Sequence, residues 1–228
     1  QRRDLVKRRY LPPIIPTRNL VLLKAPQGCG KTHWVGESGL PELRKQHPGA
    51  VVLYITHRRS MARAAATRLG LPCYLDKAGP ITGDTVISVD SLHRVRLDEE
   101  SRFIIVLDES EQVINHMALS GTMDGAQKLV AACAWVSVLN HAVSIVAMDA
   151  DLSELTLAEI KEHAPGDLKK MDLAELIYCP PAQGASDWTY TLAEQKEWAE
   201  RQLLDCYEGG ERVAVACQSR KQAEALAL

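Results

Sequence analysis

The sequence predicts an α/β fold in which helices cover both faces of a mainly parallel sheet. Short aliphatic or β-branched runs alternate with stretches of helical pattern along most of the 228 residues. The runs are apolar almost throughout, as expected for parallel strands that are buried on both faces. Hydrophobic residues make up 46% and charged residues 25% of the chain, and there is a single Phe, so a folded domain with an aliphatic core is expected.

The alternation allows each element to be placed in order. An all-α or all-β fold would not produce so regular an exchange between the two periods. Strands are expected at residues 20–24, 51–55, 85–89, 103–107 and 143–148. Helices are expected at residues 31–37, 58–69, 124–140 and 152–162.

The chain is expected to hold one complete domain and the beginning of another. Pro and Gly are frequent just after position 178, which is typical of a linker, and a further helix, strand and capped helix follow. The chain begins at Gln and ends inside an apparent helix, which predicts a piece of a longer protein. The expected divisions are a basic N-terminal arm with its lead-in segment at 1–19, a first domain at 20–178, a linker at 179–190 and a truncated second domain at 191–228.

Charge and composition limit the classes of partner. The net charge of −2 creates no global field for a phosphate polymer, so nucleic acid would have to bind local patches. Five of the first ten residues are basic, and they form either a solvated arm or a nucleic-acid contact. The six cysteines include no CxxC pair, which favours reduced, buried thiols. No apolar run reaches the roughly 20 residues that cross a bilayer, so we expect a soluble protein of the cytoplasm or nucleus without membrane contact.

The strongest motif follows the first expected strand. The pattern AxxGxGKT leads directly into a helix, which is the context that a phosphate-binding Walker A loop requires. Gly28 and Gly30 let the backbone curl with its amides inward, Lys31 would reach the β- and γ-phosphates from a solvent-facing position, and the Thr32 hydroxyl would bind Mg²⁺. The alternative is a turn that spells GKT by chance. The expected ATP-binding residues are Ala25, Pro26, Gln27, Gly28, Cys29, Gly30, Lys31 and Thr32.

A second motif ends the strand at 103–107. The apolar run stops at Asp108-Glu109-Ser110-Glu111, and parallel strands present such residues at the carboxyl edge where α/β folds bind ligands. Asp108 would hold Mg²⁺ through water, and Glu109 would orient and deprotonate the attacking water. A helix-capping acid is the alternative explanation of this pattern.

Together these two motifs resemble those of the superfamily 2 helicases, whose first motif is AxxGxGKT and whose second is DExx. Here the second ends in Glu111, where a DEAD-type box ends in Asp. The resemblance implies a RecA-like P-loop domain that hydrolyses ATP to unwind or remodel nucleic acid. It also implies that a second domain supplies arginines to the nucleotide, so that this chain alone should be weakly active.

Three further segments extend the resemblance. Thr56, His57, Arg58 and Arg59 follow the strand at 51–55 and offer donors to phosphate oxygens, unless they form only a basic helix end. Ser91, His93 and Arg94 could contact the same strand of nucleic acid. Asp149 and Asp151 occupy the place where the family couples hydrolysis to domain motion, although Asp151 could simply cap the next helix.

The turn at 56–60, the segment Asp90–Arg94 and the segment Met148–Ser153 are similar to those of herpesvirus-type origin-binding proteins and of plasmid or phage replication helicases. Tyr10-Leu11-Pro12 before the first strand adds to the likeness. This resemblance implies a role in replication initiation, with DNA favoured over RNA and replication proteins as further partners.

Two other classes remain open from the sequence. A viral DNA-packaging terminase ATPase uses a similar loop and acidic strand. A non-catalytic, NTP-dependent switch would bind nucleotide without turnover, but it would not need Glu109. A small-molecule kinase is disfavoured because no lid-like cluster of arginines is present and a second α/β unit begins after the linker.

Overall fold

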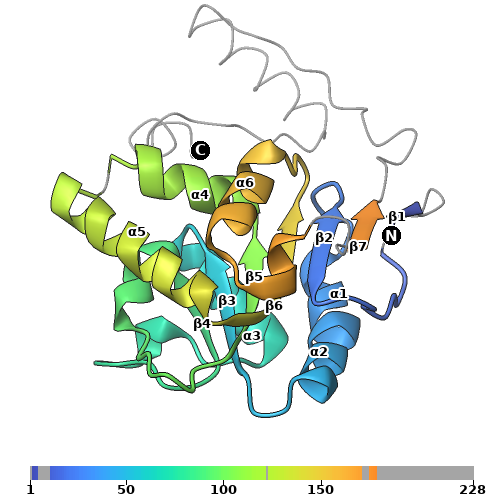
Figure 1. Ribbon diagram of the computed structural model, residues 1–228, viewed down its shortest axis with the longest axis horizontal. Coiled ribbons are helices and arrows are strands. Elements are labelled where there is room, and N and C mark those ends of the chain that lie inside the picture. Colours follow the sequence, from blue (N-terminus) through green and yellow to red (C-terminus); the bar gives the residue numbers. More distant parts are fainter. Residues whose placement is uncertain (1, 5–10, 122, 171–174, 179–228) are drawn as a thin grey trace, which may run out of the picture. The chain divides into compact units, whose positions relative to one another are not determined.

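A parallel sheet with helices on both faces forms the part of the chain that the structure describes (Figure 1). The computed structural model describes residues 2–4, 11–121, 123–170 and 175–178. Within these residues the sheet has seven strands in the order β1-β7-β2-β6-β5-β3-β4, and every pairing is parallel. The expected α/β fold with a mainly parallel sheet is therefore confirmed. The strands are β1 (Arg2–Asp4), β2 (Leu20–Lys24), β3 (Val51–Thr56), β4 (Thr85–Ser88), β5 (Phe103–Asp108), β6 (Ala142–Asp149) and β7 (Glu175–Tyr178).

All five expected strands are present, and their ends differ from expectation by one residue at most. β3, β5 and β6 each run one residue further than expected, because Thr56, Asp108 and Asp149 continue the backbone ladder despite their polar side chains. β1 and β7 were not expected; both are short, and β7 pairs with β2, which lies far away in the sequence. The linker at 179–190 and the second domain at 191–228 lie outside the described residues.

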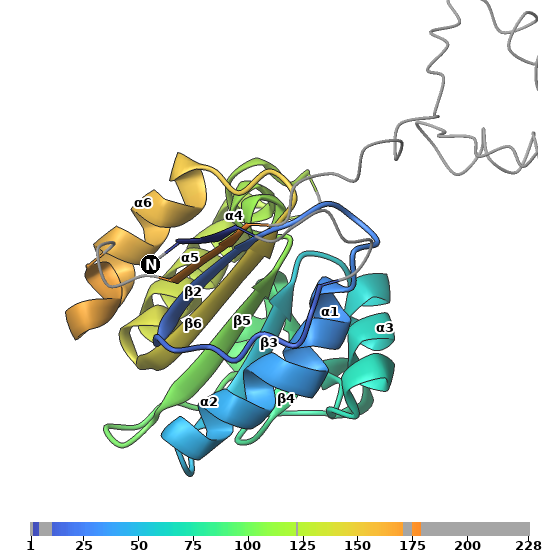
Figure 2. The ribbon, with the colours of Figure 1, turned by 90° about the vertical axis from the view of Figure 1, so that its right-hand side faces the viewer.

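Helices cover the two faces of the sheet in two groups, as Figure 2 shows. None of the described helices is both long and apolar enough to span a bilayer. The first group is α1 (Lys31–Trp34), α2 (Leu40–Gln46) and α3 (Arg59–Leu69). The second group is α4 (Ser110–Leu119), α5 (Gly125–Asn140) and α6 (Glu154–His163).

Helix ends follow local capping chemistry. Asp124 accepts a hydrogen bond from the Gln127 amide in a capping box, so α5 begins one residue later than expected. Ser153 caps α6 by accepting from the Leu155 amide at 3.2 Å, so the interpretation of Asp151 as the cap is wrong. The expected helix at 31–37 instead continues through a π-helical stretch, Val35–Gly39, into α2.

Two differences from the expected elements lie near the site. α4 was not expected, although Val113, Ile114 and Met117 recur at helical spacing and are buried. The chain leaves the sheet after Ser88, where β4 ends, and forms the 3-10 helix Val89–Arg94 against α5.

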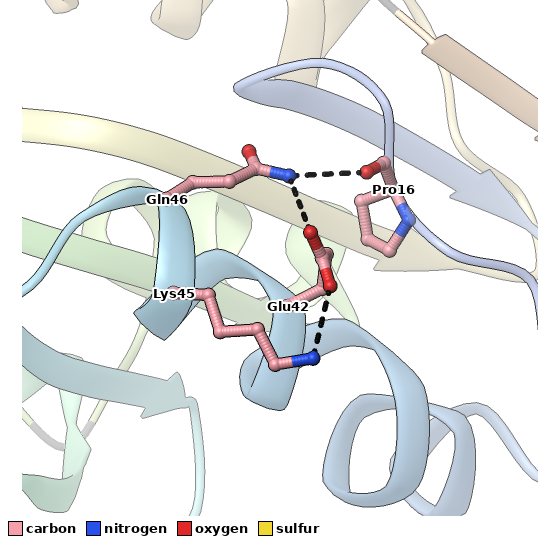
Figure 3. Close-up of polar contacts among 4 residues, drawn as sticks. All are labelled: Pro16, Glu42, Lys45 and Gln46. Carbon is pink, nitrogen blue, oxygen red and sulfur yellow. Dashed lines mark hydrogen bonds and ion pairs between the residues drawn. The ribbon is translucent and has the colours of Figure 1, made fainter.

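The lead-in segment before β2 is tied to the first helices. Figure 3 shows Gln46 donating to the Pro16 carbonyl at 3.4 Å and to Glu42 at 3.2 Å, while Lys45 pairs with Glu42 at 3.4 Å. The buried Trp34 indole donates to the Ile14 carbonyl at 2.9 Å. Residues 11–16 are therefore held against the helices rather than extending as a free arm.

Candidate nucleotide and nucleic-acid site

The sheet register brings the candidate residues to one edge. Lys24 at the end of β2 pairs with Asp149 of β6, and Met148 of β6 pairs with Asp108 of β5. Thr56 at the end of β3 pairs with Ser88 of β4. Because all these strands are parallel, the loops that follow them meet at the carboxyl edge of the sheet.

The loop after β2 curls as its glycines allow. Gly28 has a φ of 74° and Gly30 a φ of 87°, in the left-handed region where a side chain would cause strain. The loop is held at both sides: the Ala25 amide donates to the Asp149 carbonyl at 3.0 Å, and the Cys29 carbonyl accepts from Leu11 at 2.9 Å. The curl is therefore a fixed feature of the fold.

Lys31 lies inside this curl. Its ammonium donates to the carbonyls of Ala25 at 2.8 Å and Pro26 at 3.1 Å, and the residue is only 8% exposed. The expectation that Lys31 faces solvent is wrong, because the carbonyl groups of the loop supply acceptors that draw the ammonium inward. The same position puts the charge where an anion in the loop would meet it.

Asp108 ends β5, Glu109 follows it, and the two carboxylates differ in their surroundings. Asp108 is 8% exposed; burial raises its pKa, and the Tyr54 hydroxyl and the Lys31 ammonium oppose that rise. Glu109 has a φ of 55° and is the only non-glycine among the described residues in the left-handed region. Such strain is often stored at functional positions. Burial raises the pKa of Glu109, and the charges of Asp108 and Asp149 raise it further.

The geometry also bears on the capping alternative. Glu109 occupies the N-cap position of α4, yet its side chain makes no capping hydrogen bond; only its carbonyl accepts, from Gln112 at 2.9 Å and Val113 at 3.0 Å. A cap alone therefore does not explain the carboxylate. Its raised pKa makes it a better proton acceptor than an exposed Glu.

One cavity of about 520 Å³ unites the two motifs. Small residues of α3 leave the room for it, and Arg68 of the same helix lines it, which the sequence did not indicate. Of the expected loop residues, Ala25, Pro26 and Cys29 do not line the cavity and instead shape the curl. The lining consists of Gln27, Gly28, Gly30, Lys31, Thr32, Met61, Ala64, Ala65, Arg68, Asp108 and Glu109.

A hydrogen-bond network joins the acidic motif to α6. Asp149 is buried; one carboxylate oxygen accepts from the Glu111 amide and the other from the Asp151 amide, both at 3.0 Å. The Glu111 carboxylate accepts from the Ser153 amide at 2.8 Å, the Ser153 hydroxyl at 2.7 Å and the Thr156 hydroxyl at 2.6 Å. Asp149 is thus integrated in the network, whereas the exposed Asp151 takes part through its backbone. Glu111 was not expected as a functional residue, although its place in the DExx motif was a signal.

The residues after β3 line a second, larger cavity of about 1010 Å³. Arg58 and Arg59 are exposed on its wall, while Thr56 is buried and donates to the Arg58 carbonyl at 3.2 Å. His57 is buried with its ring 6.3 Å from that of His116 of α4, and burial together with the Arg58 charge lowers its pKa. Of the four expected contacts Thr56, His57, Arg58 and Arg59, the two arginines are therefore the ones exposed to a large anion.

The expected contacts in Val89–Arg94 are placed differently. Arg94 donates to the carbonyls of Tyr74 at 3.2 Å and Gly79 at 3.0 Å, and its guanidinium lies 5.8 Å from the Tyr74 ring centre. His93 is exposed, with its ring near the Asp90 carbonyl at 3.0 Å. Neither these two side chains nor Ser91 lines the larger cavity, which Asp90 reaches instead. Arg94 therefore stabilises a loop in this structure, and its contact with nucleic acid stays a prediction.

The parallel sheet with its edge loops has a RecA-like fold. A variant of S. cerevisiae Dbp5 bound to RNA and ADP BeF3 matches with a TM-score of 0.56 at 15% identity, over 94% of this chain and 56% of that one. A DEAD box protein from Methanococcus jannaschii matches with a TM-score of 0.45 at 16% identity, over 92% of this chain and 58% of that one. At 15% identity the likeness to the Dbp5 variant concerns the fold alone.

The family is more specific. Residues 7–162 match the family described as origin of replication binding protein, of the herpesvirus type, and the chain belongs to that family. It is 28% identical over 239 aligned positions to an uncharacterized protein of Picosynechococcus sp. (strain PCC 7002), over 96% of this chain and 23% of that protein. The chain thus spans less than a quarter of that relative's length. The resemblance drawn from the sequence motifs is confirmed.

Proposed function

We propose that this chain is an ATP-hydrolysing motor domain of a helicase or translocase that acts on nucleic acid during replication initiation. The observation that carries the proposal is the single cavity that the curled loop, Lys31, Asp108 and Glu109 share. The family contributes the origin-binding context, and the RecA-like fold agrees with a motor role. DNA is the favoured partner because the family is described by its binding to replication origins.

The loop would hold the phosphates of ATP. Its glycines give the curl in which backbone amides can face an anion, and the Lys31 ammonium lies inside that curl, where negative charge is favoured. On binding, the ammonium would exchange the Ala25 and Pro26 carbonyls for phosphate oxygens. The hydrogen bonds from Leu11 to Cys29 and from Ala25 to Asp149 would keep the loop in shape meanwhile.

The donors at the cavity also suit Mg²⁺. Thr32 and Asp108 offer a hydroxyl and a carboxylate oxygen, and among the described residues no cluster of three His, Cys, Asp or Glu side chains competes for a metal. Mg²⁺ characteristically keeps several waters and takes few protein ligands, so two are sufficient when phosphates supply the rest. When bound, Mg²⁺ would neutralise charge that develops on the phosphate oxygens.

Glu109 would act as the general base. Its carboxylate lines the cavity, makes no capping bond and has a raised pKa, so it can orient a water and accept its proton. This role favours turnover over the alternative of a non-catalytic switch. No observation in the described residues specifically supports a packaging terminase.

The network around Glu111 would carry the coupling. Asp149 contacts the acidic motif through the Glu111 amide, and Glu111 in turn holds the start of α6 through Ser153 and Thr156. A shift of Asp108 or Glu109 during hydrolysis would therefore move α6. Arg58 and Arg59, exposed at the neighbouring cavity, would hold phosphates of the nucleic acid.

Steady-state ATP hydrolysis with and without single-stranded DNA tests the proposal. The expected result is Mg²⁺-dependent turnover that rises when DNA is added, with single-stranded RNA as the comparison. Because this chain alone is expected to be weakly active, ATP binding without turnover would support the switch alternative only in a longer protein that includes the second domain. The absence of ATP binding would refute the proposal as a whole.

A further inference from the structure

Tyr54 presents a polar atom in the middle of an aliphatic strand. The side chain is fully buried in β3, and its hydroxyl lacks a hydrogen-bond partner. A buried hydroxyl without a partner is costly, and Phe would fill the same volume without that cost. The hydroxyl is therefore a feature that packing alone does not explain.

The sheet register places Tyr54 behind the residues that line the nucleotide cavity. Tyr54 pairs with Val106 on β5, and because alternate residues share a face, Asp108 lies on the same side of the sheet one step nearer the carboxyl edge. The hydroxyl lies within interaction range of the Asp108 carboxylate and of the Thr32 hydroxyl of α1. Neither contact has the geometry of a completed hydrogen bond. The unpartnered atom thus lies between the two groups that would hold Mg²⁺.

A hydroxyl suits the position between Thr32 and Asp108 because it can both accept and donate a hydrogen bond. When Thr32 turns its oxygen lone pairs to a cation, its proton needs an acceptor on the other side. A phenol can accept that proton and donate its own to a carboxylate, whereas Phe can do neither. Tyr54 is inaccessible from the cavity and would act only through these two neighbours.

We propose that Tyr54 is a positioning residue for the magnesium site, with its hydroxyl accepting from Thr32 and donating to Asp108 when Mg·ATP is bound. The chain of bonds fixes the rotamers of both ligands. This inference rests on the proposed function, because it requires Thr32 and Asp108 to serve the metal. It adds a residue from β3 that belongs to neither the phosphate loop nor the acidic motif.

The test compares Tyr54→Phe with Tyr74→Phe as a matched control. Tyr74 is also buried but does not line the nucleotide cavity, and Phe keeps the ring that lies near Arg94. Binding of a fluorescent ATP analogue is measured as a function of Mg²⁺ concentration and again in EDTA, and thermal unfolding is recorded for each protein.

Tyr54→Phe should raise the Mg²⁺ concentration for half-maximal binding roughly 10-fold or more, the scale of a hydrogen bond to a charged group. Its binding in EDTA should be unchanged, and its Tm should equal or exceed that of the parent, because an unpartnered hydroxyl is removed. Tyr74→Phe should leave the Mg²⁺ requirement unaltered.

Two outcomes would overturn the inference. One is a Mg²⁺ requirement for Tyr54→Phe equal to that of the parent; the other is a Tm several degrees below the parent, which would show that the hydroxyl serves the core. If the parent itself bound the ATP analogue without any dependence on Mg²⁺, or not at all, the proposed function would fail instead. The parent titration therefore separates the two failures.

Discussion

Glu111→Gln should destabilise the domain at neutral pH while leaving the nucleotide cavity in place. The parent carboxylate accepts hydrogen bonds from both donors of Ser153 and from the Thr156 hydroxyl, at 2.6 to 2.8 Å. The amide removes the charge and turns an NH₂ donor toward one of these groups. Glu111 does not line the smaller cavity, so nucleotide binding should be spared.

The magnitude follows from the number of bonds. A hydrogen bond to a charged group contributes about 1.5–3 kcal/mol and a neutral one about 0.5–1.5 kcal/mol. The difference is about 1 kcal/mol for each of three bonds, and solvent screening reduces the sum because Glu111 is partly exposed. The expected loss is about 2 kcal/mol, which lowers the Tm of a domain of this size by roughly 4–8 °C.

The loss should depend on pH in a defined direction. Burial alone would raise the pKa of Glu111, but hydrogen bonds from Thr156 and Ser153 outweigh it, so the folded pKa lies below the ordinary value of 4.5. A lowered folded pKa stabilises the fold above the unfolded pKa, and that stabilisation disappears as pH falls through the folded value. The difference in the free energy of unfolding between parent and variant should therefore be largest at neutral pH and should become smaller below about pH 4.5.

Urea or thermal unfolding at neutral and acidic pH measures the effect. Glu162→Gln is the matched control, since it removes a charge from an exposed position of α6, the helix whose start Glu111 holds. It should shift the Tm by at most a degree or two. Equal stability of Glu111→Gln and Glu162→Gln at neutral pH would refute the role given to the network.

Three further predictions concern the proposed site. Lys31→Ala should abolish Mg·ATP binding in calorimetry with only a small loss of Tm, since water can reach the two carbonyls that the ammonium leaves; undiminished affinity would contradict the phosphate-loop assignment. Glu109→Gln in the full-length protein should still bind Mg·ATP but lose turnover by roughly 10²-fold or more, as expected for a general base, and normal turnover would exclude that role. Arg58→Ala combined with Arg59→Ala should weaken nucleic-acid binding across sequences and flatten its salt dependence, with ATP binding retained; fluorescence anisotropy would show an unchanged salt slope if these arginines made no phosphate contacts.

Local chemistry explains why much of this protein is readable from its sequence. Each motif of the site is a local pattern of a few residues and can be recognised in the sequence alone. These motifs are the glycines of the phosphate loop, the buried strand before it and the acids at the end of β5. The five central strands are likewise visible as apolar runs. Family membership also follows from short motifs, which the match over residues 7–162 confirms.

The predictions that were wrong or missing have both distant and local causes. Arg94 is a residue type that commonly contacts phosphate, yet its guanidinium donates hydrogen bonds to the carbonyls of Tyr74 and Gly79. Lys31 was expected in solvent, but its place inside the curl depends on how the loop closes on itself. α4 carried a helical signal that was obscured by the acidic motif at its start.

The sequence by itself determined the α/β class, the phosphate-loop pattern and the acids that end β5, because each depends on neighbouring residues. Only the tertiary structure decided the strand order that places β6 between β2 and β5 and so joins Asp149 to both motifs. It also decided that the Tyr54 hydroxyl, from a third strand, lies beside Thr32 and Asp108. The physical reason is that strand pairing and helix packing minimise the apolar area exposed by the whole domain. That total area depends on residues far apart in the sequence, so no short segment determines it.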